Sequence, residues 1–375
     1  RDGLESTWLR IIHTLLTLRL ENRTMSLVSS TCLAAADRGW LPDAVIRSGI
    51  RHLCEERLKT LNPLQSLPNQ HYLKEFITAM NSAEIAPLPD KANSQHYELP
   101  PEFFELILGD YKKYSCCYWN PGDTTLVDAE LSALEITCHR AQIEDGQRIL
   151  ELGCGWGALS LWMATNFPNA QITALSNSDS QRHYIESQAA SAGLNNLKVT
   201  TCDINNYISE SKYDRIVSIE MFEHLRNYRM MFERIASWLT PGGKLFIHIF
   251  THTERPYTFC DEGPTDWMSR HFFTGGMMPS HALPLSFEKD LVAEKHWRWN
   301  GYHYHRTAES WLVNLDHNRS SALTILKRVY GKQQSRVWFQ RWRIFFMACA
   351  ELFAMKDGEP WGVSHYRFIG NNNTN

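Results

Sequence analysis

The sequence predicts an α/β protein with a doubly wound parallel sheet, an N-terminal helical extension and a helical cap. Three observations lead to this prediction. From residue 147 onward, short apolar strands alternate with helical segments, as in parallel sheets joined by crossover helices. A glycine-rich loop follows the first of these strands. An aromatic-rich region, beginning at about residue 252, separates the fifth strand from a final one.

Composition sets limits on the class of protein. The chain has 375 residues, and its 43% hydrophobic content is ample for a sizeable core. A net charge of -3 provides no field that would hold the molecule on nucleic acid, which is therefore not an expected partner. The nine cysteines include no Cys-x-x-Cys pair, so we expect neither a metal site nor a disulfide framework. Their odd number fits a reducing, cytoplasmic location.

Residues 1–92 are expected to form the N-terminal helical extension. Pro42 stands near the first turn of a helix predicted from Ala44 to Leu61, a position that proline favours. Asn62-Pro63 and the proline-containing run Pro87 to Asp90 break the helical pattern.

The apolar segment Trp8 to Leu20 is expected to be an amphipathic helix. Arg10, His13 and Arg19 interrupt it, and it is too short to span a bilayer. No convincing small-residue cleavage pattern follows, so a signal peptide is not predicted. Stable membrane insertion is therefore not expected.

Residues 93–370 form the predicted main domain. Its sheet is expected to contain five parallel strands: Arg148 to Leu152, Gln171 to Leu175, Lys198 to Thr201, Tyr213 to Ile219 and Lys244 to Phe250. Apolar residues recur at helical spacing from Tyr228 to Leu239, and Thr240-Pro241-Gly242-Gly243 should stop this helix.

The region of about 252–350 is rich in tryptophan and is expected to be a helical cap inserted near the last strands. A final strand is predicted from Trp361 to Ile369. Residues 371–375 should be a frayed tail.

The glycine-rich loop is the first candidate binding element. Gly153, Gly155 and Gly157 follow a strand and open a helix, so the backbone can turn tightly and a nucleotide or nucleoside can approach closely. With Ala158 they also satisfy a dinucleotide fingerprint, so glycine spacing alone leaves both ligand classes open. A nicotinamide cofactor would need an acid at the end of the second strand, where Ser176-Asn177-Ser178 stands instead.

Two acidic residues favour S-adenosyl-L-methionine as the cofactor. Methyltransferases tend to place one acid directly before the glycines, where Glu151 stands, and another after the third strand, where Asp203-Ile204 stands. This ligand carries a sulfonium and no phosphate, so phosphate-binding chemistry is not required. Taken alone, Glu151 is equally well explained as a strand-end carboxylate.

Seven motifs can be recognised, the glycine-rich loop among them: Gln95 to Pro100, Tyr114 to Trp119, Glu151 to Gly157, Ser218 to His224, Phe272 to Gly276, Gly301 to Tyr304 and the helix Trp342 to Phe353. In these motifs the chain resembles the cyclopropane-fatty-acid synthase superfamily, and within it the coclaurine N-methyltransferase branch, from about residue 44 to 369. The resemblance implies a Rossmann-like class I methyltransferase fold.

The resemblance also assigns the parts of the cofactor to particular residues: Tyr114 and Ser115 to the methionine end, Gly153 and Gly155 to the amino-acid portion, Asn177 and Gln181 to the ribose, and Asp203 with Ile204 to the adenine. Without the resemblance, the position of Gln181 would be interpreted as a solvated helix position.

The two branches of the superfamily differ in their acceptors. Lipid-modifying members use bicarbonate as a base, and the resemblance maps its ligands onto four residues: Cys116, Glu223, His248 and Tyr304. All four are present here. Lipid enzymes usually carry Gly where Glu220 stands and Pro-Gly-Gly where Thr274-Gly275-Gly276 stands, whereas the amine branch carries the residues seen here. A small-molecule amine acceptor, alkaloid-like or other, is therefore expected, with bicarbonate-dependent lipid methylation or methylenation as the alternative.

Glu220, Glu223 and His224 are the candidate catalytic residues because they follow the fourth strand, at the edge where ligands bind. A protonated amine must lose a proton before it can attack, which requires a carboxylate or imidazole within reach. Glu223 and His224 are expected to be proton acceptor and relay, with Glu220 orienting the ammonium. Alternatively, Glu220 or His224 has a structural role in the turn.

Other acceptor contacts are also predicted. The resemblance implies that Glu98 contacts the amine, although it is equally explained as a surface carboxylate. His248 is either a site residue or a core histidine. Cationic acceptors bind to aromatic faces. Trp and Phe residues of this kind are more often plain core, and only a few of them, Trp267, Phe272 and Tyr304, are expected to contact substrate. The sequence leaves the oligomeric state open, a homodimer included.

Overall fold

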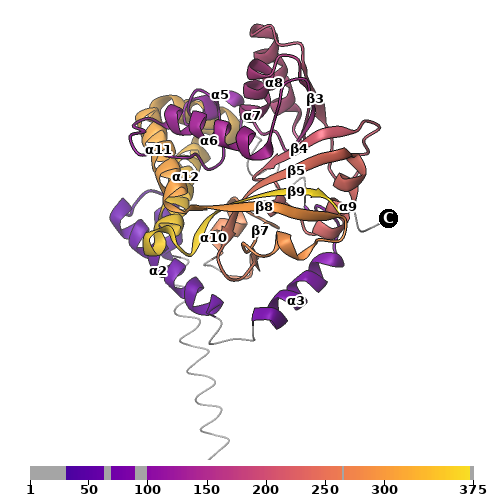
Figure 1. The fold of residues 1–375 in the computed structure, drawn as a ribbon. Coiled ribbons are helices and arrows are strands. Elements are labelled where there is room, and N and C mark those ends of the chain that lie inside the picture. The colour runs from indigo at the N-terminus through magenta and orange to yellow at the C-terminus, as the bar shows by residue number, and fades with distance from the viewer. Residues whose placement is uncertain (1–30, 63–68, 89–98, 264–265, 372–375) are drawn as a thin grey trace, which may run out of the picture.

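The computed structural model describes residues 31–62, 69–88, 99–263 and 266–371. Its centre is a seven-stranded sheet of order β3-β2-β1-β4-β5-β9-β8 (Figure 1). The first five of these strands are parallel, while β9 runs antiparallel to both of its neighbours. The strands are β1 (Arg148–Leu152), β2 (Gln171–Ser176), β3 (Leu197–Thr201), β4 (Tyr213–Ile219), β5 (Leu239–His252), β8 (Leu291–Asn300) and β9 (Trp361–Gly370).

Helices cover both faces of this sheet because its strands are apolar on both sides. Successive side chains of a strand point to opposite faces, so Ile149 of β1 packs with α6 and α7 while Leu150 packs with α9. The crossover helix α8 follows β2 and packs on β2 and β3. These helices are α6 (Leu126–Ala141), α7 (Ala158–Asn166), α8 (Asp179–Ser191) and α9 (Tyr228–Trp238).

The five parallel strands and the final strand are confirmed. β5 is longer than expected, since it begins at Leu239, directly after α9. Its pairing with β4 jumps from Tyr213↔Leu239 to Arg215↔Lys244. The run Thr240 to Gly243 therefore ends the helix, as predicted, and is then accommodated as an irregularity within the strand.

The region expected to be a helical cap differs in one respect from the prediction, because it also contains β8, an edge strand of the main sheet. Its helical parts are α10 (Trp267–His271), α11 (Tyr302–His317) and α12 (Arg319–Ala354), and it includes the small hairpin of β6 (Tyr257–Thr258) and β7 (Met277–Met278). β8 was not predicted because it lies within a region rich in aromatic residues. Its partner strand β9 also follows only after two long helices, so no nearby strand indicated the pairing.

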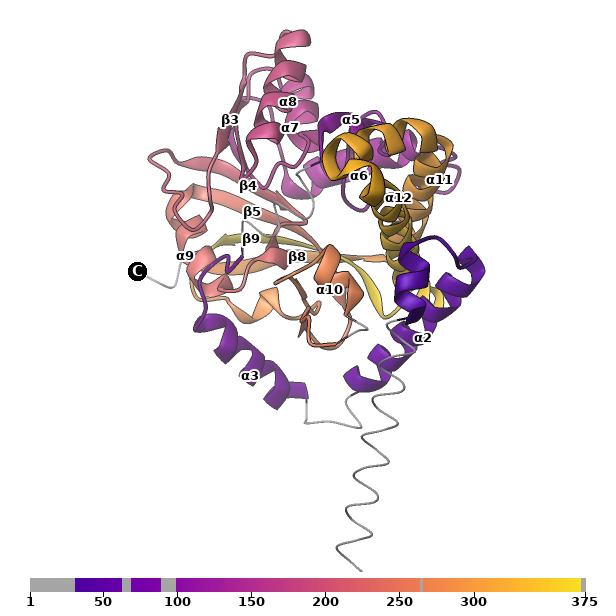
Figure 2. The same cartoon turned by 180° about the vertical axis from the view of Figure 1, so that it is seen from behind.

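The N-terminal extension contains α2 (Asp43–Leu61) and α3 (Asn69–Asn81). α2 lies beside α12, whereas α3 packs on α9 (Figure 2). Arg343 of α12 joins the layers, because its guanidinium pairs with Asp43 of α2 at 2.6 Å and with Asp316 of α11 at 2.6 Å. The expected helix in residues 8–20 and the tail from 372 onward lie outside the described residues. Within the described ranges, no helix has the length and apolarity needed to cross a membrane.

Candidate functional site

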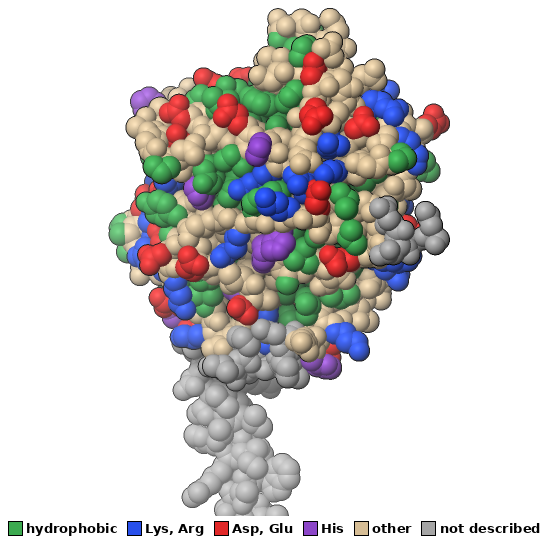
Figure 3. Space-filling view, viewed as in Figure 1, with side chains coloured by type: hydrophobic (Ala, Val, Ile, Leu, Met, Phe, Trp, Pro, Cys, Tyr) green, Lys and Arg blue, Asp and Glu red, His purple; other side chains and the backbone are tan. Residues whose placement is uncertain are grey.

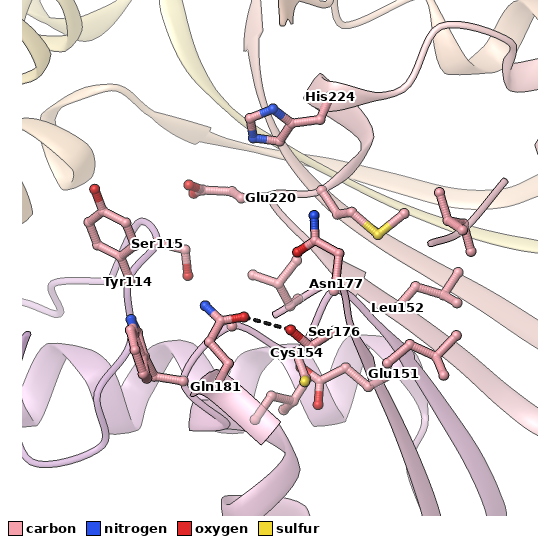
Figure 4. Close-up of a pocket in the computed structure, with 18 of the residues that line it drawn as sticks. Tyr114, Ser115, Glu151, Leu152, Cys154, Ser176, Asn177, Gln181, Glu220 and His224 are labelled. Carbon is pink, nitrogen blue, oxygen red and sulfur yellow. Dashed lines mark hydrogen bonds between the residues drawn. The ribbon is translucent and has the colours of Figure 1, made fainter. Parts of the chain in front are cut away.

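A pocket opens where the parallel strands end at their carboxyl edge (Figure 4). Three strands contribute the residue immediately beyond their ends: β1 contributes Gly153, β2 contributes Asn177 and β4 contributes Glu220. The fourth strand, β3, contributes Asp203, two residues beyond its end. Ligands bind at this edge in open α/β sheets. In Figure 4, Gln181 and Ser176 lie on one side of the opening, and Glu220 and His224 lie on the other.

The glycine loop after β1 requires glycine at two points. Gly153 has φ of 75°, and a Cβ on it would stand 2.9 Å from Cγ of Met221. Gly157 has φ of 83°, and a Cβ there would stand 2.7 Å from Cγ1 of Ile185. The left-handed backbone and the close neighbours both exclude larger residues. The loop thus packs closely against Met221, which follows β4, and against Ile185 on α8.

All nine residues predicted to bind the cofactor line this one pocket: Tyr114, Ser115, Glu151, Gly153, Gly155, Asn177, Gln181, Asp203 and Ile204. They come from the loop before α6, from the ends of β1, β2 and β3 and, in the case of Gln181, from the first turn of α8. The structure thus brings together segments that are far apart in the sequence. Their individual contacts with a ligand remain predictions.

Gln181 is buried and not solvated, with only 2% of its surface exposed. The hydroxyl of Ser176 donates to its Oε1 at 2.7 Å. Its Nε2 has no hydrogen-bond partner in the structure. Because a buried amide donor without a partner is costly, this group fits a ligand hydroxyl. Position in a helix gave no signal of this, and only the family resemblance indicated it.

Glu151 is enclosed behind the glycine loop. The hydroxyl of Ser160 donates to its carboxylate, and burial raises its pKa to about 7. Asp203 lies nearer the surface and accepts from the backbone N–H of Asn205 at 2.9 Å. The two acids that suggested the cofactor therefore have different environments.

Glu220 is the most constrained residue of the site. Its φ of 48° lies in the left-handed region, which costs a residue of this kind about 1 kcal/mol. Its Oε1 accepts from the backbone N–H of Cys116 at 2.8 Å and contacts Nε2 of His248 at 3.1 Å. Its Oε2 accepts from the hydroxyl of Tyr304 at 2.7 Å. Three groups from three segments therefore fix one carboxylate at the pocket wall.

Burial raises the pKa of Glu220, and its neighbours oppose that rise. The principal opposing charge is Lys113, which is buried and lines the pocket. Its ammonium donates to the hydroxyl of Ser115 and to the carbonyl of Cys116, both at 2.6 Å. Sequence reasoning missed Lys113 because an isolated lysine in a loop carries no pattern.

Glu223 faces away from the pocket in this structure. Its side chain is fully buried, and its Oε1 accepts from the backbone N–H of Phe250 at 2.8 Å. Burial, together with the charge of Glu220, raises its pKa well above the usual range. Its Oε2 has no hydrogen-bond partner. Glu223 is therefore a buried carboxyl group behind the pocket wall, in surroundings that disfavour its charged form.

His224 lines the pocket and stacks on Phe273, with ring centroids 4.8 Å apart. Burial lowers its pKa to about 4, although the charge of Glu220 acts in the opposite direction. The imidazole is therefore neutral near pH 7. A neutral imidazole can accept a proton, and this one lies at the pocket surface.

The predicted acceptor contacts divide into two groups. His248 and Tyr304 contact the carboxylate of Glu220, which lines the pocket, but they are not pocket-lining residues themselves. Trp267 and Phe272 do not line the pocket: Trp267 donates its indole N–H to Asp37 at 2.9 Å, and Phe272 stacks on a neighbouring ring in the core. Helix α10 turns both side chains toward α12 and the N-terminal extension. Glu98 lies outside the described residues.

Comparison with known proteins identifies the family of this chain. The model of the mycolic acid cyclopropane synthetase family matches residues 88–361. The chain belongs to this family. An (S)-coclaurine N-methyltransferase of Thalictrum flavum subsp. glaucum is 33% identical over 340 residues, which cover 90% of this chain and 94% of that protein.

Relatives with different acceptors share the family. A crystal structure of coclaurine N-methyltransferase bound to N-methylheliamine and SAH matches with a TM-score of 0.87 and 32% identity, covering 90% of this chain and 98% of that one. The cyclopropane-fatty-acyl-phospholipid synthase of Escherichia coli K12 is 27% identical over 74% of this chain and 68% of its own length. The class I fold and the identification as an S-adenosylmethionine-dependent methyltransferase are thereby confirmed.

Substituting Gly153 tests the glycine loop. We expect Gly153→Ala to weaken binding of S-adenosylhomocysteine by about tenfold or more, because its Cβ displaces Met221 and φ is unfavourable. Isothermal titration calorimetry measures the affinity. Gly193→Ala is the matched control, since Gly193 has φ of 68° but no atom within 4 Å of an added Cβ. Equal affinities for the two variants would contradict the assignment.

Proposed function

We propose that this protein is an N-methyltransferase of a small-molecule amine, alkaloid-like or of another amine class. The observation that carries the proposal is the Glu220 carboxylate, held at the pocket wall by Cys116, His248 and Tyr304. A fixed carboxylate beside the cofactor loop suits a cationic acceptor, because opposite charges attract strongly where water is excluded.

The same three contacts argue against the lipid-type alternative. Cys116, His248 and Tyr304 are three of the four residues that the family resemblance maps onto bicarbonate. In this chain they already contact the carboxylate of Glu220. A carboxylate tethered to the chain thus takes the place in which a free bicarbonate ion would act as base.

The pocket residues also fit the cofactor. The unpartnered Nε2 of Gln181 suits a ribose hydroxyl, and the glycine loop allows close approach to the backbone. We assign Tyr114 and Ser115 to the methionine end, and Asp203 with Ile204 to the adenine. When bound, S-adenosylmethionine supplies a methyl group on a sulfonium, and the protein's main task is to hold the acceptor nitrogen in line with it.

His224 is the proposed proton acceptor. Its imidazole lies at the pocket surface and is neutral near pH 7. Burial weakens it as a base, whereas the negative charge of Glu220 raises its pKa and so favours proton uptake. Glu220 holds the ammonium of the acceptor, and Nδ1 or Nε2 of His224 takes the proton, which leaves a lone pair on the acceptor nitrogen. Glu223, expected from the sequence to accept this proton, is buried against the backbone of β5. We therefore assign it a supporting role behind the turn.

The relatives support an amine acceptor. The (S)-coclaurine N-methyltransferase covers nearly the whole chain at 33% identity, whereas the E. coli lipid synthase matches less of it at 27%. The sequence features that distinguish the branches, Glu220 and Thr274-Gly275-Gly276, agree with this order.

A substrate panel tests the proposal directly. We expect methyl transfer from labelled S-adenosylmethionine to benzylisoquinoline or arylethylamine acceptors and none to phospholipid vesicles, with products identified by mass spectrometry. Methylation of lipid without methylation of any amine would reverse the ranking of the two functions.

Substituting His224 tests the proton acceptor. We expect His224→Gln to lower kcat by about 10²-fold or more, the usual effect of losing acid-base assistance, while S-adenosylhomocysteine affinity stays unchanged. His317→Gln, at an exposed position of α11, is the control. A kcat close to that of the wild type would exclude His224 as the base.

Replacing Glu220 by glycine tests whether its carboxylate stands in for bicarbonate. We expect wild-type activity to be independent of added bicarbonate. Glu220→Gly should lose about 10²-fold in turnover and recover part of it as bicarbonate is added, because Cys116 N–H, His248 and Tyr304 then lack a partner. Glu220→Gln, which fills the space, should show no recovery. Wild-type activity that depends on bicarbonate would favour the lipid-type mechanism.

A further inference from the structure

Two buried histidines lie behind Glu220 within the sheet. His248 of β5 and His365 of β9 are directly opposite each other across the two strands. Both are fully buried, and their ring centroids are 4.6 Å apart. Two imidazoles inside a sheet are costly to desolvate unless they are hydrogen-bonded, so their partners are informative.

One nitrogen of each imidazole ring has a polar contact with another side chain. Nε2 of His248 lies 3.1 Å from Oε1 of Glu220, at the pocket. Nδ1 of His365 lies 2.9 Å from a terminal nitrogen of Arg140, on α6. Directly opposed residues of neighbouring strands share one face of a sheet. The four side chains thus form a row that runs from Arg140 along the face covered by α6 to the carboxylate in the pocket.

Arg140 fixes the direction of this row. An arginine has only donors, so Nδ1 of His365 must accept. Burial lowers the pKa of both histidines well below the usual range, so both rings are neutral. His365 therefore carries its proton on Nε2. The proposed function requires an ionised Glu220, and His248, which faces it, then carries its proton on Nε2 and leaves Nδ1 as an acceptor.

The inner nitrogens of the two rings complement each other. Nε2 of His365 is a donor without a partner, and Nδ1 of His248 is an acceptor without a partner. They belong to adjacent rings. A hydrogen bond between these two nitrogens would complete a chain in which every donor points toward Glu220.

Arg140 can supply a positive charge at the end of the row opposite to Glu220. Its guanidinium stacks on Trp297 at 5.0 Å and on Trp299 at 5.6 Å. Burial lowers its pKa to about 10, which still leaves it cationic near pH 7. Among the described residues no carboxylate forms an ion pair with it. Lys and Arg side chains gather over β8 on this face (Figure 3), where Arg140, Lys295 and Arg367 border a shallow pocket.

We propose that Arg140 and His365 are positioning residues, which act through His248 to keep the Glu220 carboxylate ionised and aimed at the acceptor cation. This inference rests on the proposed function. It assigns a role to two residues that do not line the pocket, Arg140 on α6 and His365 on β9, and neither touches substrate or cofactor.

Other groups also act on Glu220 and must be kept constant in a test. Lys113 and the Cys116 N–H favour its ionised form, as do Tyr304 and His224, whereas burial and Glu223 oppose it. The charge of Lys113 also lowers the pKa of His248. Substitution of Arg140 leaves these groups in place, so a change in Glu220 reports on the row itself.

The test uses a probe that does not itself titrate. The phenethyltrimethylammonium ion is permanently cationic, so the pH dependence of its binding reports on the protein. Its affinity for the S-adenosylhomocysteine complex is measured by calorimetry between pH 5 and 8, for wild type and variants. We expect binding to weaken as pH falls, as Glu220 becomes protonated, and Glu220→Gln should abolish this dependence.

Arg140→Met and His365→Phe should each move the midpoint of this transition upward by about one pH unit, because loss of a donor or a nearby cation disfavours the charged carboxylate. Lys295→Met removes another cation stacked on Trp297 and should leave the midpoint unchanged. An unshifted midpoint in both folded variants, or in either one if the other does not fold, overturns the inference. Failure of wild type to bind the cation, or an unchanged dependence in Glu220→Gln, would instead count against the proposed function.

Discussion

The site depends on the position of one carboxylate. Glu220 follows β4 in a left-handed backbone conformation, and its backbone N–H donates to the carbonyl of His248 on β5. This bond fixes the residue against the neighbouring strand, so its side chain projects into the pocket. Groups from the loop before α6, from β5 and from α11 then converge on its two oxygens. The strain of the left-handed backbone at Glu220 is thus offset by the contacts that its backbone and carboxylate make.

The fold makes this convergence possible. Parallel strands deliver the cofactor loop and Glu220 to the same edge of the sheet. The antiparallel strand β9 inserts beside β5 and places His365 opposite His248. The helices α11 and α12 pack an aromatic core beside the sheet, from which Tyr304 reaches the pocket wall. Loss of any of these elements would remove a partner of the same carboxylate.

The signals of the cofactor site that the sequence displays are local: glycines at fixed spacing and strand-end acids. Tyr114, Ser115, Asn177 and Gln181 were assigned only through the family resemblance. All nine predicted residues line one pocket, and their contacts with a cofactor stay predictions. Sequence reasoning was less successful where function depends on orientation. Glu223 and His224 are adjacent in sequence, yet one faces β5 and the other faces the pocket. Trp267 and Phe272 have the composition of an aromatic cage but pack in the core.

The sequence by itself therefore determined the five parallel strands, the final strand, the family and the cofactor, since each follows from periodicity or from short motifs, whereas the edge strand β8 emerged only from the structure. Only the tertiary structure decided which side chains meet at the carboxylate, that Lys113 stands beside it, and that Arg140 is linked to it through two histidines. These contacts join residues from distant parts of the chain. Their distances and burial, which set charge and proton position, exist only once the strands and helices have packed.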